Sequence, residues 1–296
     1  MTQIIYEHGF LVVDKEPGMT SHDVVAIARR ALNTRKVGHA GTLDPMATGV
    51  LVLGFNNGTR LLQYITDGDK SYTATIVLGA STVTDDHEGE TLVSTDAHAV
   101  DDAEIKRILS TMVGTISQRP SSVSAVKVDG ERAYDRVRAG EVFELAARTV
   151  TISSLQVLDI RHLETTTEVD IDVTCSAGTF IRAIARDLGD ELKVGGHLRA
   201  LRRTRVAGFA LDVATSIEDL KGKNFTALHL TDVARRTFDA RELTAEEVRE
   251  LSFGRPLSPS ASDGIVAGVS GENELIALLK NESDKAKPVA VFAAAH

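Results

Sequence analysis

Apolar and polar positions alternate along the chain in two rhythms, which indicates both strands and helices. Short apolar runs bounded by turn residues predict strands at 10–14, 72–78, 123–128, 149–160 and 168–175. Apolar residues at helical spacing predict helices at 21–32, 102–112 and 179–192. Strands outnumber helices and often follow one another directly, which favours an antiparallel or mixed sheet over a repeated strand–helix–strand array. The expected fold class is therefore α/β (α+β), with a mixed, largely antiparallel sheet flanked by helices and loops.

The ends of the expected elements carry further signals. Ser21 is the expected N-cap of the first helix, because its hydroxyl can accept a hydrogen bond from the first turn. The pattern changes after about residue 230, where a helix-like segment, 244–251, leads to short apolar runs separated by glycines. The last of these runs is a predicted strand at 289–292. These features predict a large domain at 1–230 and a small β-rich module at 231–296.

Composition indicates a soluble globular protein. The chain has 296 residues, 43% of them apolar, which suffices for a large and a small domain. No apolar run is long enough to span a bilayer, and the first residues lack a signal peptide's pattern, so we expect a cytoplasmic protein without a membrane partner. The single cysteine, Cys175, excludes disulfide scaffolding and cysteine-based metal sites, and no HxxxH or HxH pair suggests zinc.

Charge is unevenly distributed along the sequence. The formal net charge of −9, taken as an average, argues against a nucleic-acid partner. Basic residues nevertheless gather in two short segments, at 29–39 and at 199–205. Each cluster alone is typical of a solvated face, but clusters that flank candidate active-site segments favour a phosphate-binding groove.

The segment Gly38–Gly49 holds a single carboxylate, Asp44, in a glycine-rich setting. Pro45 restrains Asp44 to extended backbone angles, so we expect a loop that presents the carboxylate from rigid apolar flanks. An acid presented in this way is a candidate nucleophile or base, and an Asx-turn or helix cap is the alternative role. A nucleotide phosphate loop fits poorly, because the GxxxxGK[ST] lysine is absent and an aspartate would repel phosphate.

Five ordered blocks of sequence resemble those of the bacterial tRNA pseudouridine-55 synthases, the TruB family. They are 10–21 (FLVVDKEPGMTS), 36–49, 70–74 (KSYTA), 120–127 (PSSVSAVK) with Gly130 and Tyr134, and 175–182 (CSAGTFIR), and 198–204 adds a further match. The resemblance implies the pseudouridine synthase fold and an isomerase that converts uridine to pseudouridine in the T-loop of tRNA. It implies no metal and no organic cofactor. The expected partner is the T-arm stem-loop of tRNA, with no protein partner and a monomeric state.

The segment 231–296 matches the family more weakly and resembles a PUA-like RNA-binding module. Its acidic balance disfavours strong phosphate binding. A family-specific cap on the larger domain is the alternative interpretation.

The resemblance also implies roles for three catalytic candidates. Asp44 is similar to the family's catalytic aspartate, whose carboxylate could attack C1′ or remove the C2′ proton to give a glycal, and the sequence leaves both open. Arg182 is the expected partner of Asp44, through charge-assisted hydrogen bonds from its guanidinium. Tyr72 is expected to stack on the target uracil with its hydroxyl close enough to help proton transfer at C5.

Other residues are expected to hold the RNA while the target nucleotide is flipped out. His39 resembles a histidine beside the flipped nucleotides, and Leu201 a leucine in the uracil pocket; a loop histidine bonded to backbone carbonyls and an ordinary core leucine are the alternatives. The candidate phosphate contacts are Lys15, Lys36, Arg202 and Arg203.

The acidic segment 81–89 departs from the family pattern, because Val83 stands where an aspartate is usual. Asp86 is left as a structural or substrate-adjacent acid. A non-catalytic RNA-binding protein with the same fold is the alternative function, which the intact Asp44, Tyr72 and Arg182 oppose. An RNA-guided relative is opposed by the ordinary bacterial pattern of the blocks.

Overall fold

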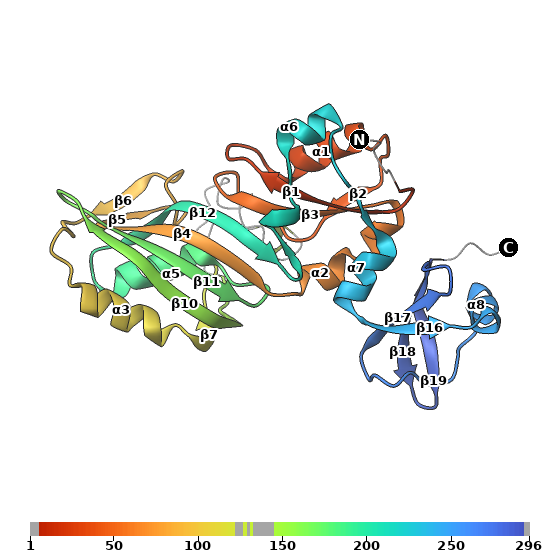
Figure 1. Ribbon diagram of the computed structural model, residues 1–296. Helices are drawn as coiled ribbons and strands as arrows, with labels where there is room; N and C mark the ends of the chain where they lie inside the picture. The colour runs from red at the N-terminus through yellow and green to blue at the C-terminus, as the bar shows by residue number, and fades with distance from the viewer. Residues whose placement is uncertain (1–5, 122–126, 129–130, 133–144, 293–296) are drawn as a thin grey trace. The chain divides into compact units, whose positions relative to one another are not determined.

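Two compact units make up the chain. The computed structural model describes residues 6–121, 127–128, 131–132 and 145–292 (Figure 1). The first unit comprises Met1–Pro45, Gly49–Thr66 and Val206–His296, and the second comprises Met46–Thr48 and Asp67–Arg205. Among the described residues, no helix has the length and apolar character needed to cross a membrane.

The core of the first unit is built on two long apolar strands. β1 (Gly9–Lys15) pairs antiparallel with β3 (Thr48–Phe55), in register from Gly9↔Phe55 to Lys15↔Gly49. The strands β2 (Val37–His39) and β15 (Leu228–His229) add antiparallel partners, and β14 (Thr215–Ser216) pairs parallel with β1. The unit also contains the helices α1 (Ser21–Ala31), α2 (Leu62–Thr66), α6 (Ile217–Gly222) and α7 (Leu230–Thr237). Nearly every side chain of β1 and β3 is buried, which explains their continuous apolar sequences.

The N-cap of α1 differs from the prediction. The cap is Thr20, whose side chain accepts a hydrogen bond from Asp23 N at 3.1 Å, while the Asp23 carboxylate accepts from Thr20 N at 2.8 Å. This reciprocal capping box satisfies two backbone donors, and its hydrogen bonds lower the pKa of Asp23. Ser21 is instead the first helical residue and points into the buried side of the helix.

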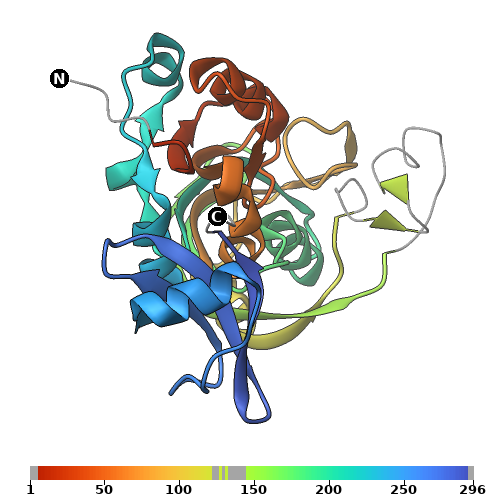
Figure 2. The ribbon, with the colours of Figure 1, turned by 90° about the vertical axis from the view of Figure 1, so that its right-hand side faces the viewer.

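The C-terminal segment of the first unit folds around its own four-stranded sheet. The order is β16 (Asp239–Leu243), β17 (Ile265–Ser270), β18 (Leu275–Glu282) and β19 (Lys285–Val291), with β16 and β17 parallel and the other pairs antiparallel. The helix α8 (Ala245–Ser252) lies against β16, β18 and β19 (Figure 2). The prediction of a β-rich module is confirmed, including the helix near 244–251, whereas its boundary at residue 230 stays a prediction. The sequence pattern missed α7 and β16, which are short.

The second unit is a sheet with helices packed on it. Its strands follow the order β12 (Gly196–Val206), β4 (Lys70–Leu78), β11 (Thr167–Cys175), β10 (Arg148–His162) and β7 (Gly114–Gln118). The pairs β4–β11, β11–β10 and β10–β7 are antiparallel. The helices α3 (Asp102–Thr111) and α5 (Ile181–Glu191) contact each other, and they pack against β10 and β4 respectively. The strands β5 (Ala80–Thr82) and β6 (Thr91–Ser94) form a separate hairpin. The α/β class with a mixed, largely antiparallel sheet is thus confirmed.

Most of the expected elements of this unit are present, with two exceptions. Of the strand expected at 123–128, only β8 (Lys127–Val128) is described, paired with β9 (Glu131–Arg132); its other residues, and the motif residues Gly130 and Tyr134, lie outside the described residues. The helix expected from 179 begins at Ile181. Phe180 is extended there, because the Gln118 side chain accepts from Phe180 N at 2.8 Å and donates to Phe180 O at 3.1 Å.

Gly189, near the end of α5, packs closely against the turn that follows this helix. A Cβ on Gly189 would overlap the backbone of Gly195 and Gly196. We therefore predict that Gly189→Ala lowers the free energy of unfolding by about 1–3 kcal/mol, although alanine favours a helix by about 1 kcal/mol. Urea unfolding measures the change. Gly222→Ala at the end of α6 is the matched control, because nothing lies within 4 Å of its Cβ position; equal stability of the two variants would contradict the prediction.

Candidate active site

The candidate residues divide between the two units. The first unit holds Lys15, Lys36, His39 and Asp44, and the second holds Tyr72, Arg182, Leu201, Arg202 and Arg203. The expected pairing of Asp44 with Arg182 stays a prediction.

Asp44 lies in a loop, as its sequence context predicts. Residues 40–47, between β2 and β3, form neither helix nor strand, and Asp44 is half-buried there. Gly41 adopts a φ of 85°, in the region where a side chain would be strained. The position of Asp44 therefore depends on contacts to its neighbours rather than on a helix or a sheet.

The residue before Asp44 is held by a buried hydroxyl. Ser21 Oγ accepts a hydrogen bond from Leu43 N at 2.9 Å and donates to Leu43 O at 3.2 Å. Leu43 itself is 4% exposed, so its side chain is also anchored in the core. One side chain thus satisfies both backbone polar groups of Leu43.

The residue after Asp44 is held by the turn that follows β1. Gly18 N donates to Pro45 O at 2.9 Å, and Lys15 Nζ donates to the same oxygen at 3.1 Å. Lys15 Nζ also donates to Glu16 O at 2.9 Å and Met19 O at 2.7 Å. Lys15 is buried, and its ammonium donates to these three backbone carbonyls, so its expected contact with phosphate stays a prediction.

The other two candidates of the first unit lie near its surface. Lys36 is exposed, together with Arg29, Arg30 and Arg35. His39 is half-buried in β2 and makes an edge-to-face contact with the ring of His22, with centroids 5.6 Å apart. These residues form a basic surface with exposed cations in the segment that precedes the Asp44 loop.

Arg182 is the second residue of α5 and is deeply buried in the second unit. Its Nη1 donates to Thr84 O at 2.7 Å and lies 3.2 Å from Asp86 Oδ2, and the two side chains are 7% and 4% exposed. The other oxygen of Asp86 accepts from Thr84 Oγ1 at 2.6 Å and from Glu88 N at 3.1 Å. Asp86, which the sequence left as structural or substrate-adjacent, is therefore a buried acid that orients Arg182.

The loop that carries Asp86 is also tied to β12. His87 N donates to Leu198 O at 2.9 Å, and Leu198 N donates to Asp85 O at 3.0 Å. Asp85 adopts a φ of 58°, and burial raises the pKa of its carboxyl. Arg186, one turn after Arg182, contacts that carboxyl at 3.3 Å. Two arginines of α5 thus bind consecutive aspartates of one loop.

Tyr72 lies on β4 among buried residues of the same face. It stands opposite Val173 of β11 and is 8% exposed. Lys70, two residues earlier, is also buried, and this burial, followed by the charge of Arg203, lowers the pKa of its ammonium. Tyr72 therefore extends from a paired strand, two residues from the buried cation Lys70.

The candidates of β12 differ in exposure. Arg203 is 1% exposed, so its guanidinium lies inside the protein, and its expected role as a phosphate contact stays a prediction. Arg202 is half-buried and donates to Thr48 Oγ1 at 3.4 Å. Leu201 is 8% exposed, which agrees with an ordinary core leucine and leaves the pocket role open.

Three contacts of this site were not predicted from the sequence. Each is a hydrogen bond between residues far apart in the sequence. Ser21 bonds Leu43, 22 residues away, and Gln118 bonds Phe180, 62 residues away. The Arg182 side chain donates to Thr84 O, 98 residues away. No local pattern marks a polar side chain whose partner is so distant. The only available signal was their position inside or beside the family blocks.

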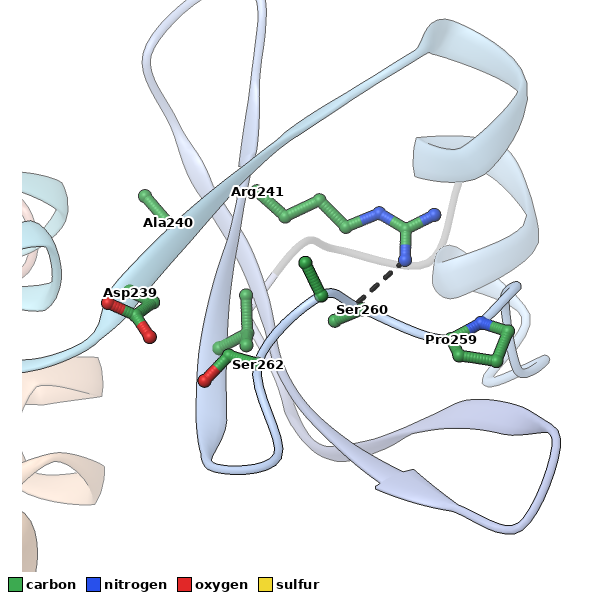
Figure 3. Close-up of a pocket in the computed structure, with 8 residues that line it drawn as sticks. Asp239, Ala240, Arg241, Pro259, Ser260 and Ser262 are labelled. Atoms are coloured by element: carbon green, nitrogen blue, oxygen red, sulfur yellow. Dashed lines mark hydrogen bonds between the residues drawn. The ribbon is translucent and has the colours of Figure 1, made fainter.

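A hollow of about 720 Å³ lies apart from these residues, in the C-terminal segment (Figure 3). Its lining includes Asp239, Arg241, Ser260 and Ser262. The Arg241 guanidinium is engaged by the protein itself: Nη1 donates to Ser258 O at 2.7 Å, and Nη2 donates to Glu247 Oε1 at 2.5 Å. None of the residues expected in catalysis lines this hollow.

Comparison with known proteins gives consistent matches along the chain. Residues 29–181 match the family profile "TruB family pseudouridylate synthase (N terminal domain)". Residues 182–237 match "tRNA pseudouridylate synthase B C-terminal domain", and residues 238–293 match "tRNA Pseudouridine synthase II, C terminal".

Similar proteins cover nearly the whole chain. The tRNA pseudouridine synthase B of Arthrobacter sp. (strain FB24) is 51% identical over 96% of both chains. That of Nocardia farcinica is 50% identical over 96% of this chain and 92% of its own. Among solved structures, a chain of a Cbf5-Nop10-Gar1 complex superposes with a TM-score of 0.73 at 25% identity, over 97% of this chain and 85% of that one.

The buried pair of Arg182 and Asp86 yields a stability prediction. Asp86→Ala would leave the guanidinium charge buried without its carboxylate, so we expect a loss of about 3–5 kcal/mol in the free energy of unfolding. Urea unfolding measures it. Glu104→Ala removes the carboxylate of an exposed pair with Arg107 on α3, and we expect little change there because solvent screens that pair. Similar losses in the two variants would contradict the assignment of Asp86 to a buried ion pair.

Cys175 yields a reactivity prediction. Burial raises the pKa of its thiol to about 11, so almost none of it is thiolate at pH 8. We expect an aromatic disulfide reagent to react with the native protein only as slowly as the protein opens, and rapidly after denaturation. Because the chain has one cysteine, the absorbance change reports this thiol alone. Rapid stoichiometric reaction of the native protein would contradict the prediction.

Proposed function

The chain belongs to the TruB family of pseudouridylate synthases, and on that premise we propose that Asp44 is the carboxylate with which it isomerises uridine in the T-loop of tRNA. The enzyme is an isomerase of the tRNA pseudouridine synthase class. The observation that carries the proposal is the fixed backbone on both sides of Asp44, through Leu43 and Pro45. A half-buried carboxylate held in this way is oriented before substrate arrives.

The reaction can be balanced with a carboxylate as the central group. The C1′–N1 bond breaks, the uracil turns within the site and a C1′–C5 bond forms; the C5 proton is lost and N1 gains one. Asp44 would serve either by attack at C1′ or by removal of the C2′ proton, and both roles remain open. Both require a carboxylate whose position is fixed relative to the ribose.

Tyr72 and Arg182 complete the proposed catalytic set. The support for Arg182 is its orientation by Thr84 and Asp86 within the second unit. The support for Tyr72 is its place on a paired strand, which restricts its ring to few orientations. We expect that ring to stack on the target uracil, and the Arg182 guanidinium to pair with the Asp44 carboxylate.

The proposed substrate contacts are the exposed cations near the Asp44 loop. Arg29, Arg30, Arg35 and Lys36 are exposed, and we propose that they bind phosphates of the T-arm while the nucleotide is flipped. His39 would lie beside the flipped nucleotides, and Arg202 remains a candidate phosphate contact. A tRNA-modifying enzyme acts where tRNA is found, so we propose a cytoplasmic location.

The test follows release of tritium from uracil C5 in an unmodified tRNA transcript. We expect release by the wild type, and a loss of at least about 10²–10⁴-fold in Asp44→Asn, because the amide cannot act as nucleophile or base. Binding of tRNA to this variant should be preserved in a filter assay.

A transcript with the T-loop target uridine replaced is the substrate control, and we expect no release from it. Turnover by Asp44→Asn would remove Asp44 from catalysis. Tight binding without release by the wild type would instead favour the RNA-binding function.

A further inference from the structure

Ser21 is a buried polar residue that the helix containing it does not need. It is the first residue of α1 and is 1% exposed. The capping role belongs to Thr20, whose hydroxyl accepts from Asp23 N at 3.1 Å. The Ser21 hydroxyl is therefore available for a contact outside the helix.

That contact is a reciprocal pair of hydrogen bonds to a single residue. Ser21 Oγ accepts from Leu43 N at 2.9 Å and donates to Leu43 O at 3.2 Å. A hydroxyl offers one donor and two acceptor lone pairs, so Leu43 occupies its donor and one of its lone pairs. Leu43 O belongs to the peptide group that ends at Asp44 N. The hydroxyl thus fixes the peptide plane from which Asp44 extends.

The opposite side of Asp44 is fixed independently of Ser21. Pro45 O accepts from Gly18 N at 2.9 Å and from Lys15 Nζ at 3.1 Å. Loss of the Ser21 hydroxyl would leave this anchor and the buried Leu43 side chain in place and would remove the two bonds to the Leu43 backbone. The expected result is a folded loop in which the Asp44 carboxylate is turned or displaced, rather than a disordered loop.

We propose that Ser21 is a positioning residue for the reaction: it acts through Leu43 to hold the Asp44 carboxylate in its reactive orientation. The inference rests on the proposed role of Asp44. Displacement of a reacting group by about 1 Å can lower a rate by about 10²-fold. Binding of tRNA depends on many other contacts and should not change.

The experiment compares kcat and KM for tRNA in Ser21→Ala, at a temperature where every variant is folded. We expect kcat to fall by about 10–100-fold with KM within about threefold of wild type, since the lost interaction serves the transition state rather than tRNA binding. Thr20→Ala is the matched control. It removes the cap of the same helix and lowers thermal stability, but it leaves the bonds to Leu43 intact, so its kcat should stay within about twofold of wild type.

A second variant at the same site covers a failure of Ser21→Ala to fold. Ser21→Cys is similar in size, but its thiol is a weak donor and acceptor, so kcat should also fall. A wild-type kcat in either folded variant would overturn the proposal. An equal fall of kcat in Thr20→Ala, or failure of both Ser21 variants to fold, would also overturn it, because Ser21 would then serve helix α1 or folding.

Asp44→Asn in the same assay separates this inference from the proposed function. If Asp44→Asn retains turnover, the proposed role of Asp44 fails whatever Ser21→Ala does. If Asp44→Asn is inactive while Ser21→Ala keeps the wild-type kcat, only the role of Ser21 fails.

Discussion

The placement of a carboxylate on irregular backbone is the constraint on which this site depends. Residues 40–47 form neither helix nor strand, so a regular ladder does not pair their backbone groups. For Leu43 and Pro45, on either side of Asp44, partners come from one short stretch, 15–21, which supplies an ammonium, an amide and a hydroxyl. A buried lysine is costly unless its charge is satisfied, and three carbonyl oxygens around Lys15 Nζ provide that satisfaction. The segment after β1 and the loop after β2 are therefore joined by these hydrogen bonds, and each depends on the other for its conformation.

The second unit solves a similar problem with arginine. The loop 84–88 is irregular and holds two aspartates, each of which contacts an arginine of α5. Hydrogen bonds from Thr84 Oγ1 and Glu88 N to Asp86 satisfy the oxygen that does not face Arg182. Breaking such a pair leaves an uncompensated buried charge, so its members are coupled to folding as well as to orientation. Gln118 bonds the backbone of Phe180, which is extended, so α5 begins at Ile181 and Arg182 lies in its first turn.

Sequence periodicity predicted the elements whose packing is local. Strands β1, β4, β10 and β11 and helices α1 and α3 follow from apolar runs and helical spacing. The sequence pattern indicates only a basic cluster at strand β12, because its four arginines equal its apolar residues in number and interrupt the apolar alternation that marks a strand. Contacts at long sequence separation could not be predicted, as with Ser21 and Leu43. The glycine-rich segment 38–49 indicated Asp44, and the resemblance to a family added Tyr72 and Arg182, but neither indicated what holds these residues.

Burial also changes how the charge of this chain relates to RNA binding. The net charge of −9 counts every ionisable group equally, whereas a phosphate responds to charges within about a Debye length, 8 Å at physiological salt. Of the basic residues near the candidate site, Lys15 and Arg203 are buried, and the Lys15 ammonium is directed at backbone carbonyls. Exposed cations such as Arg29, Arg30, Arg35 and Lys36 contribute to the local field at the surface. Arg29 and Arg30 lie in the last turn of α1, where the negative end of the helix dipole stabilises their positive charges. An acidic protein can therefore present a basic surface to RNA, and the position of that surface depends on which basic residues are exposed.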